Sequence, residues 1–508
     1  MHPAVTIPRW ICLTGSGGNG YNSRRQAAST GLAGSGGSMV FSSKVFLFVF
    51  FPLTVLLYLL TPKKLKNYTL LLMSLLFYAF GEPVFVFVMA GSILVNYLLA
   101  LLIGRSSSPL ARKWLLALCV ALNIGALVAF KYLAFLTGIL NALLGTQLQV
   151  GRITLPIGIS FYTFQTLSYV IDVYRRSVAV QRNPMKLGMY VSFFPQLIAG
   201  PIVRYADIAK EIDSRSVSLD DLVDGVRRFI VGLSKKVLLA DTFARCADKV
   251  FALKAEELTT PIAWAGILAY TLQIYFDFSG YSDMAIGMGR MFGFHFLENF
   301  NYPYVSASLT EFWRRWHISL STWFRDYLYI PLGGNRRGNV YLNLSLVFLL
   351  TGLWHGASMT FVLWGLWHGA FLIAERLMKR RGGLPGRVPK PLKHGYTLLA
   401  VILGWVLFRS DTLAGALHFA GVMFGRESPG FKPFNLAYVV DARLVTMGLV
   451  GLVASLNPLG AVRRLAAARP AWRGALHYAS LALAFLLFAA SLLFVMNQGY
   501  SPFIYFRF

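Results

Sequence analysis

Long apolar runs separated by short basic connectors are the feature that most constrains how this chain can fold. Runs of membrane length recur between about residues 44 and 494, and only 14% of the 508 residues are charged. Such runs can satisfy their backbone hydrogen bonds in helices, and they lack the alternation of barrel strands. We therefore predict an all-α, polytopic helical membrane protein with about 11–13 membrane segments, re-entrant helices included.

The formal net charge of +27 raises the question of nucleic acid, but the distribution of the charge argues against that partner. The basic residues lie in connectors between apolar runs, as in Lys63-Lys64, Arg105 to Lys113, Arg175-Arg176, Arg336-Arg337 and Lys379-Arg380-Arg381. This pattern is typical of cytoplasmic loops and attracts acidic headgroups. We expect anionic lipid as a partner and no nucleic acid.

Residues 1–38 differ from the rest of the chain. They hold two Gly/Ser-rich stretches, Gly15–Gly18 and Gly34–Ser38, and no apolar run of membrane length. This composition predicts a flexible tail, or a start assigned upstream of the true one at Met39. Residues 39–508 are expected to form one membrane domain.

The stretch from Glu311 to His368 carries two histidines, His317 and His355, each next to a tryptophan. An ionisable side chain at membrane depth is costly, so each is a functional candidate. Small residues, Gly352 and Gly356, flank His355 and permit close approach of other groups. Apolar side chains at steps of three and four predict one amphipathic helix at the membrane interface with His317 at its edge; they are Trp313, Trp316, Leu320, Trp323, Phe324 and Tyr327.

Other titratable residues have simpler interpretations. A histidine in a membrane protein often only hydrogen-bonds a neighbouring helix, which is the interpretation for His295, His368, His394, His418 and His477. The three cysteines form no CxxC motif and no two histidines have a helical ligand spacing, so no metal site is expected. Asp283 and Arg290 share a helix face, and they either neutralise each other or lie near the substrate.

The blocks around His317 and His355 resemble the two histidine motifs of the membrane-bound O-acyltransferase (MBOAT) family. They are most similar to its bacterial branch, which includes alginate O-acetylation and D-alanyl transfer proteins. Blocks at residues 155–172, 190–203 and 404–413 resemble the alginate type, and the resemblance extends over residues 39–508. It implies an MBOAT-like membrane domain with His355 as the catalytic residue and His317 as the second histidine of the site.

The resemblance also implies a reaction. An MBOAT-like protein of this branch passes acetyl from a cytoplasmic donor, expected to be acetyl-CoA, across the bacterial inner membrane. Periplasmic acetyltransferase partners then place it on an exopolysaccharide, and no tightly bound cofactor is expected. Candidates along the acyl path are Arg315, Asp283 and Trp354.

Three alternatives remain open at this stage. The same family includes D-alanyl and peptidoglycan O-acyl transfer proteins. Polar segments broken by Pro and Gly at membrane depth are also typical of transporters. A membrane scaffold for a periplasmic acetyltransferase would have the same composition.

The chemistry fits two histidines that share one site. Acyl transfer to a hydroxyl needs a base, and histidine titrates near neutrality. No G-x-S-x-G motif supports a serine acyl-enzyme. The apolar run 340–353 would rise roughly 20 Å, less than the ~30 Å core. We therefore predict a funnel-like indentation that brings the two imidazoles within about 15 Å, a distance that one acyl-thioester can bridge.

Overall fold

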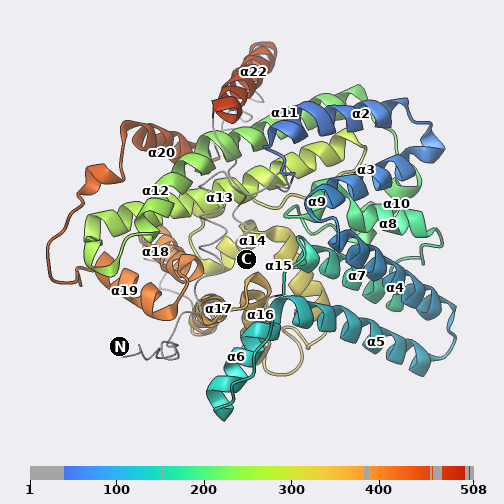
Figure 1. Ribbon diagram of the computed structural model, residues 1–508, viewed down its shortest axis with the longest axis horizontal. Coiled ribbons are helices and arrows are strands. Elements are labelled where there is room, and N and C mark those ends of the chain that lie inside the picture. Colours follow the sequence, from blue (N-terminus) through green and yellow to red (C-terminus); the bar gives the residue numbers. More distant parts are fainter. Residues whose placement is uncertain are drawn as a thin grey trace, which may run out of the picture.

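The computed structural model describes residues 39–151, 153–382, 388–457 and 472–497, together with the single residues 460 and 503. Within these ranges the ordered elements are helices and no strand is formed (Figure 1). The predicted all-α class is confirmed. The predicted tail at residues 1–38 and the side chain of His477 lie outside the described residues.

Four described helices are long and apolar enough to cross a membrane: Phe85–Arg105 (α4), Pro109–Leu144, Lys390–Arg409 (α18) and Gly474–Asn497 within α22 (Arg473–Asn497). Four shorter apolar helices accompany them: Phe46–Leu60, Val340–His355 (α16), Leu413–Met423 (α19) and Ala442–Ser455 (α20). The chain is a membrane protein on this evidence.

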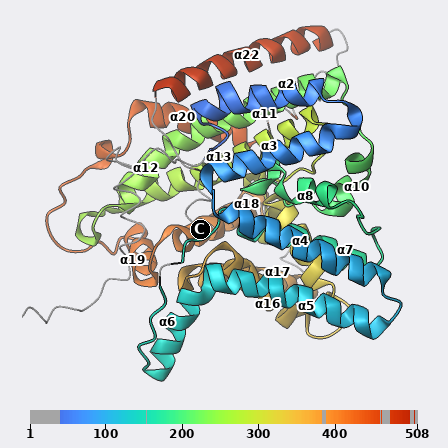
Figure 2. The same cartoon turned by 45° about the vertical axis from the view of Figure 1, so that its right-hand side comes forward.

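The helix Pro109–Leu144 is not regular along its length. It consists of α5 (Pro109–Leu127), a π-helical turn η3 (Val128–Tyr132) and α6 (Leu133–Leu144). Figures 1 and 2 show α6 leaving the direction of α5 at this turn. A π-turn inside an α-helix is a known cause of a bend and is frequent at functional sites.

Two long helices, α11 (Leu219–Ser234) and α13 (Thr260–Met291), run side by side across the molecule (Figure 1). They touch through glycines, because a Cβ added to Gly232 would come within 2.5 Å of the Gly280 carbonyl oxygen. Helix α13 also supports the segment that leads to His317, because Ser282 on α13 accepts a hydrogen bond from the Asn299 side chain at 3.0 Å.

Residues 159–203 form a series of helices separated by breaks. Helix α7 (Ile159–Tyr174) is almost wholly buried, and so are α8 (Pro184–Ser192) beyond its first turn, α9 (Phe194–Leu197) and the chain up to Val203. The chain is interrupted within residues 190–203, since α8 ends where Phe193 takes a non-helical conformation.

The remaining helices complete the shell and the centre of the molecule. Nearer the outside are η1 (Phe46–Phe50), α2 (Phe51–Leu60), α3 (Lys66–Gly81) and α10 (Tyr205–Asp213). Helices η4 (Lys235–Ala240) and α12 (Asp241–Phe251) bury most of their residues. In the centre are α14 (Leu309–Arg315), α15 (Ile318–Phe324), η7 (Arg325–Tyr329) and α17 (Met359–Arg380) (Figure 1). Short 3-10 turns lie at η2 (Lys63–Leu65), η5 (Ala255–Glu257), η6 (Pro303–Val305) and η8 (Leu436–Tyr438).

Candidate active site

The two predicted histidines lie together in the interior. His317 precedes α15 and His355 is the last residue of α16, and their ring centroids are 6.5 Å apart. His317 is fully buried and His355 is 5% exposed. The prediction that the two imidazoles come within reach of one acyl group is therefore confirmed. The funnel-like indentation itself stays a prediction.

The single amphipathic helix predicted over Trp313 to Tyr327 is wrong. The chain forms α14, breaks at Trp316 and His317, and then forms α15 and the π-turn η7. His317 has a left-handed backbone with φ of 43°. The break is held by backbone pairing with a remote segment, from Ile318 N to Asn299 O (2.9 Å) and from Asn301 N to Arg315 O (2.9 Å). These bonds override the helical periodicity and turn His317 into the core.

Asn299 fixes the imidazole of His317. Its Oδ1 accepts hydrogen bonds from His317 Nδ1 (3.2 Å) and from the backbone N–H and hydroxyl of Ser319 (3.2 and 2.9 Å). Its Nδ2 donates to Ser282 Oγ on α13 (3.0 Å), which sets the orientation of the amide. Because a carbonyl oxygen only accepts, Nδ1 of a neutral ring carries the proton and Nε2 keeps its lone pair. That Nε2 is buried and has no hydrogen-bond partner in the described part of the chain.

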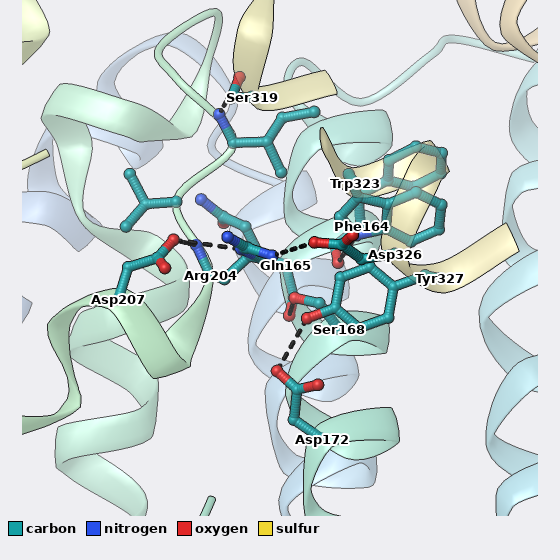
Figure 3. A network of polar contacts seen from close by, with 12 residues as sticks. Phe164, Gln165, Ser168, Asp172, Arg204, Asp207, Ser319, Trp323, Asp326 and Tyr327 are labelled. Carbon is teal, nitrogen blue, oxygen red and sulfur yellow. Dashed lines mark hydrogen bonds and ion pairs between the residues drawn. The ribbon is translucent and has the colours of Figure 1, made fainter. Parts of the chain in front are cut away.

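A polar network holds α15 and η7 against their neighbours (Figure 3). Arg204 bridges Asp326 (2.7 Å) and Asp207 (3.3 Å), and the Tyr327 hydroxyl donates to Asp172 on α7 (2.8 Å). Trp323 adds an N–H donated to the Phe164 carbonyl at 3.0 Å and a stack on the Phe164 ring. Ser319 Oγ accepts from the Ile202 N–H at 3.0 Å. Helix α15, which follows His317, is thus fixed to α7 and to residues 202–207.

His355 lies in an aromatic enclosure. Its ring centroid is 4.9 Å from that of Trp354, 5.0 Å from Trp364 and 5.2 Å from Phe408. Helix α16 approaches α17 so closely at Gly352 that the Gly365 Cα would lie 3.3 Å from an added Cβ. The predicted use of small residues near His355 is confirmed at this position. An enclosure of this kind excludes water from a reactive acyl group.

The three candidates for the acyl path, Trp354, Arg315 and Asp283, have different surroundings in the structure. The Trp354 ring lies 6.1 Å from that of His317, so this tryptophan lines the site. Arg315 bonds Glu311 (2.9 Å) and the Asn301 carbonyl (3.1 Å). Its guanidinium thus ties the backbone of this segment together.

Asp283 is an ion-pair partner of other helices. It pairs with Arg228 on α11 and with Lys235 on η4, both at 2.6 Å. Arg290 pairs instead with Asp224 at 2.9 Å, so the suggested neutralisation of Asp283 by Arg290 is wrong. Arg228 and Lys235, from the adjacent α11 and η4, pair with the Asp283 carboxylate in place of Arg290. The sequence of α13 alone could not reveal these partners.

The other described histidines behave as packing or surface residues. His368 accepts from the Trp313 indole N–H at 3.3 Å, the interhelical contact that the simple interpretation expects. His295 bonds Glu211, His394 bonds the Ser306 carbonyl and His418 bonds the Ala255 carbonyl.

Sequence reasoning missed two residues beside the site, Lys131 and Tyr132. Both lie in the π-turn η3, and both donate to carbonyls at the end of α16: Lys131 to Trp354 and Tyr132 to Leu353. The available signal was a single basic residue inside an otherwise apolar span, which is itself unusual.

The arrangement can carry out acyl transfer. Two imidazoles face a shared enclosure, one has a fixed tautomer with a lone pair on Nε2, and aromatic rings exclude solvent. A lone pair of this kind can accept the proton of an attacking hydroxyl group.

Comparison with known proteins points the same way. The sequence model of the membrane-bound O-acyltransferase (MBOAT) family matches residues 175–385, which include both histidines. A probable alginate O-acetylase AlgI of Pseudomonas putida is 43% identical, over 92% of this chain and 100% of its own length. A peptidoglycan O-acetyltransferase of Helicobacter pylori is 37% identical over 76% of this chain and 80% of its own.

A teichoic acid D-alanyltransferase of Bacillus subtilis is more distant. It is 29% identical over 39% of this chain and 53% of its own length. The relatives that match this chain over most of their length are acyl-transfer enzymes, and the site offers the groups that such transfer requires. The chain is an O-acyltransferase and belongs to the membrane-bound O-acyltransferase family.

Proposed function

We propose that this protein is a membrane O-acetyltransferase that moves acetyl from a cytoplasmic donor across the inner membrane for O-acetylation of an exopolysaccharide, with alginate as the first candidate. The observation that carries the proposal is the pair of buried imidazoles 6.5 Å apart inside an aromatic enclosure. The acceptor class is supported by the alginate O-acetylase relatives, which match over their full length. Peptidoglycan is the second candidate acceptor, supported by the less similar relative of Helicobacter pylori.

The donor is a thioester, and we expect acetyl-CoA. His355 acts as general base and takes the proton of the attacking hydroxyl or thiol. The nucleophile forms a bond to the acetyl carbon, and the carbonyl electron pair moves onto oxygen. When this intermediate collapses, the carbon–sulfur bond breaks and the thiolate receives the proton from His355. His317 aligns the reactants from the other side of the enclosure.

The short length of α16 supports the proposed transfer across the membrane. Helix α16 has 16 residues, which span roughly 24 Å, less than the ~30 Å hydrocarbon core. In this proposal His355, at the end of α16, lies within the thickness of the bilayer. A donor that enters from the cytoplasm and an acceptor from the periplasm can reach the same enclosure without a separate transporter. Periplasmic acetyltransferases receive the acetyl group and complete the modification.

Anionic lipid is proposed as a further partner at the cytoplasmic surface. A cavity of about 450 Å³ lies where the membrane-length helices α4 and α5 meet the chain after α7, and it is lined by Ser106, Arg112, Arg176 and Ser177 among others. The two guanidinium groups that line this cavity, of Arg112 and Arg176, suit an acidic headgroup.

The test is acetylation of the polymer in cells that carry the His355→Ala variant. We expect complete loss of polymer acetate at normal membrane accumulation. His394→Ala is the matched control, because that histidine bonds a backbone carbonyl outside the enclosure. Full acetylation by the His355→Ala variant would contradict the assignment and would favour a transporter or a scaffold. Acetate on peptidoglycan but not on the exopolysaccharide would assign the second acceptor.

A further inference from the structure

A lysine lies in the middle of a membrane-length helix, where a charge is costly. Lys131 belongs to the π-turn η3 of the helix Pro109–Leu144. Its Nζ donates to the Trp354 carbonyl (2.5 Å), the His355 carbonyl (3.4 Å) and Ser160 Oγ (3.4 Å). The three N–H groups are thus matched by three neutral acceptors. Within the described residues no carboxylate takes part in these bonds, so the ammonium group faces only the partial negative charge of its neutral acceptors.

The acceptors of Lys131 lie at a special place, the C-terminal end of the helix that carries His355. The last carbonyls of a helix have no partner within it, and they form the negative end of its dipole. Here Tyr132 satisfies the Leu353 carbonyl (2.8 Å), and Lys131 satisfies those of Trp354 and His355. One π-turn therefore caps the end of α16. At membrane depth these carbonyls must find partners inside the protein.

A cap alone would not need a charge. Tyr132 shows that a neutral hydroxyl can satisfy a carbonyl at this depth, and a glutamine in place of Lys131 could also donate. An ammonium group held beside His355 has a second use, because acyl transfer places negative charge on the carbonyl oxygen of the intermediate. Preorganised positive charge in a dry site stabilises such an oxyanion strongly.

We infer that Lys131 is a positioning residue of the acyl-transfer site, which holds the end of α16 and supplies the positive charge that favours the oxyanion intermediate beside His355. The inference rests on the proposed role of His355. Lys131 acts through the helix end and its charge, and it takes no proton from the acceptor. The π-turn serves this purpose by turning Lys131 and Tyr132 together toward α16.

The test compares substitutions at Lys131 in purified protein, with acetyl-CoA as donor and release of the thiol as the readout. Lys131→Gln keeps a hydrogen-bond donor and removes the charge, and Lys131→Met removes both. We expect kcat to fall about 10²-fold in each variant, with KM within about threefold, as for loss of one oxyanion-stabilising group. Lys131→Arg keeps the charge and should recover at least tenfold of that loss.

Two controls separate charge from capping. Tyr132→Phe removes one hydrogen bond to the same helix end and no charge, so its kcat should fall by less than about tenfold. Lys113→Met removes an exposed lysine of the same helix and should leave kcat unchanged. If Lys131→Met does not accumulate in the membrane, the Lys131→Gln variant decides the result.

Wild-type kcat in Lys131→Gln, or no recovery in Lys131→Arg, would overturn the inference. The His355→Ala variant is measured in the same assay. Activity in His355→Ala would contradict the proposed function. Loss of activity in His355→Ala together with full activity in Lys131→Gln would contradict only the role of Lys131.

Discussion

The contact between α16 and α17 gives a prediction whose size can be worked from the structure. A Cβ added to Gly352 would meet the backbone of α17 at Phe361 and Gly365, where no side chain can rotate away. The methyl group would lie about 1 Å inside ordinary contact distance of the Phe361 carbonyl oxygen. Gly352→Ala must therefore move the end of α16, and with it His355, by a similar amount.

Reaction geometry is sensitive to shifts of this size. A misplacement of about 1 Å can reduce a rate about 10²-fold. We expect kcat for acetyl transfer to fall by about that factor in Gly352→Ala, while overpacking lowers the free energy of unfolding by only about 1–3 kcal/mol. The assay is thiol release by purified protein, with accumulation and thermal unfolding measured in parallel.

The matched control is Gly125→Ala on α5, where nothing lies within 4 Å of an added Cβ. Its activity should stay within about twofold of the parent, and its helix should gain slightly because alanine is the better helix former. Unchanged kcat in Gly352→Ala would refute the view that tight packing of α16 on α17 positions His355.

Two further predictions concern groups that the structure assigns to holding other residues. Asn299→Ala removes the acceptor of His317 Nδ1 and should lower kcat about tenfold or more with little change in KM, measured by the same thiol-release assay. Ser218→Ala removes the N-cap of α11 and should lower the free energy of unfolding by about 1 kcal/mol in thermal denaturation. The hydrogen bond from the Ser218 hydroxyl lowers the pKa of Asp221, so the stability from this pair is present at neutral pH and lost as the pH falls through that lowered pKa. The variant should therefore show a weaker loss of stability on acidification, and an identical acid profile would contradict this.

Much of the architecture could be predicted from patterns that lie close together in the sequence. The apolar runs indicated helical membrane segments, and α13 begins and ends where its apolar run does. The meeting of His317 and His355 could also be predicted, because a run as short as 340–353 cannot carry His355 across the whole core.

The failures arose where residues far apart in the sequence compete with local preference. The periodicity of Trp313 to Tyr327 favours one helix, but backbone hydrogen bonds to Asn299 and Asn301 stabilise a break at His317. The shared helix face of Asp283 and Arg290 suggests, as one of two possibilities, that they neutralise each other, whereas α11 and η4 supply the cations that pair with Asp283. The segments that supply these partners lie far away in the sequence, so the helical periodicity of a single stretch cannot reveal them.

Lys131 is marked in the sequence by its position inside an apolar span. A single lysine within an apolar span is unusual in any membrane helix. Its acceptors, however, belong to α16, which follows much later in the chain. Sequence alone could mark the residue as a candidate, and only the fold could connect it with His355.

The central claim is that this chain transfers the acyl group itself, with His355 as the base. The most direct measurement is thiol release from acetyl-CoA by the purified protein in liposomes, comparing the parent with His355→Ala and His394→Ala. The account predicts turnover in the parent and the His394→Ala control, and none above background in His355→Ala at equal incorporation and equal thermal stability. Equal turnover in the parent and in His355→Ala would contradict it.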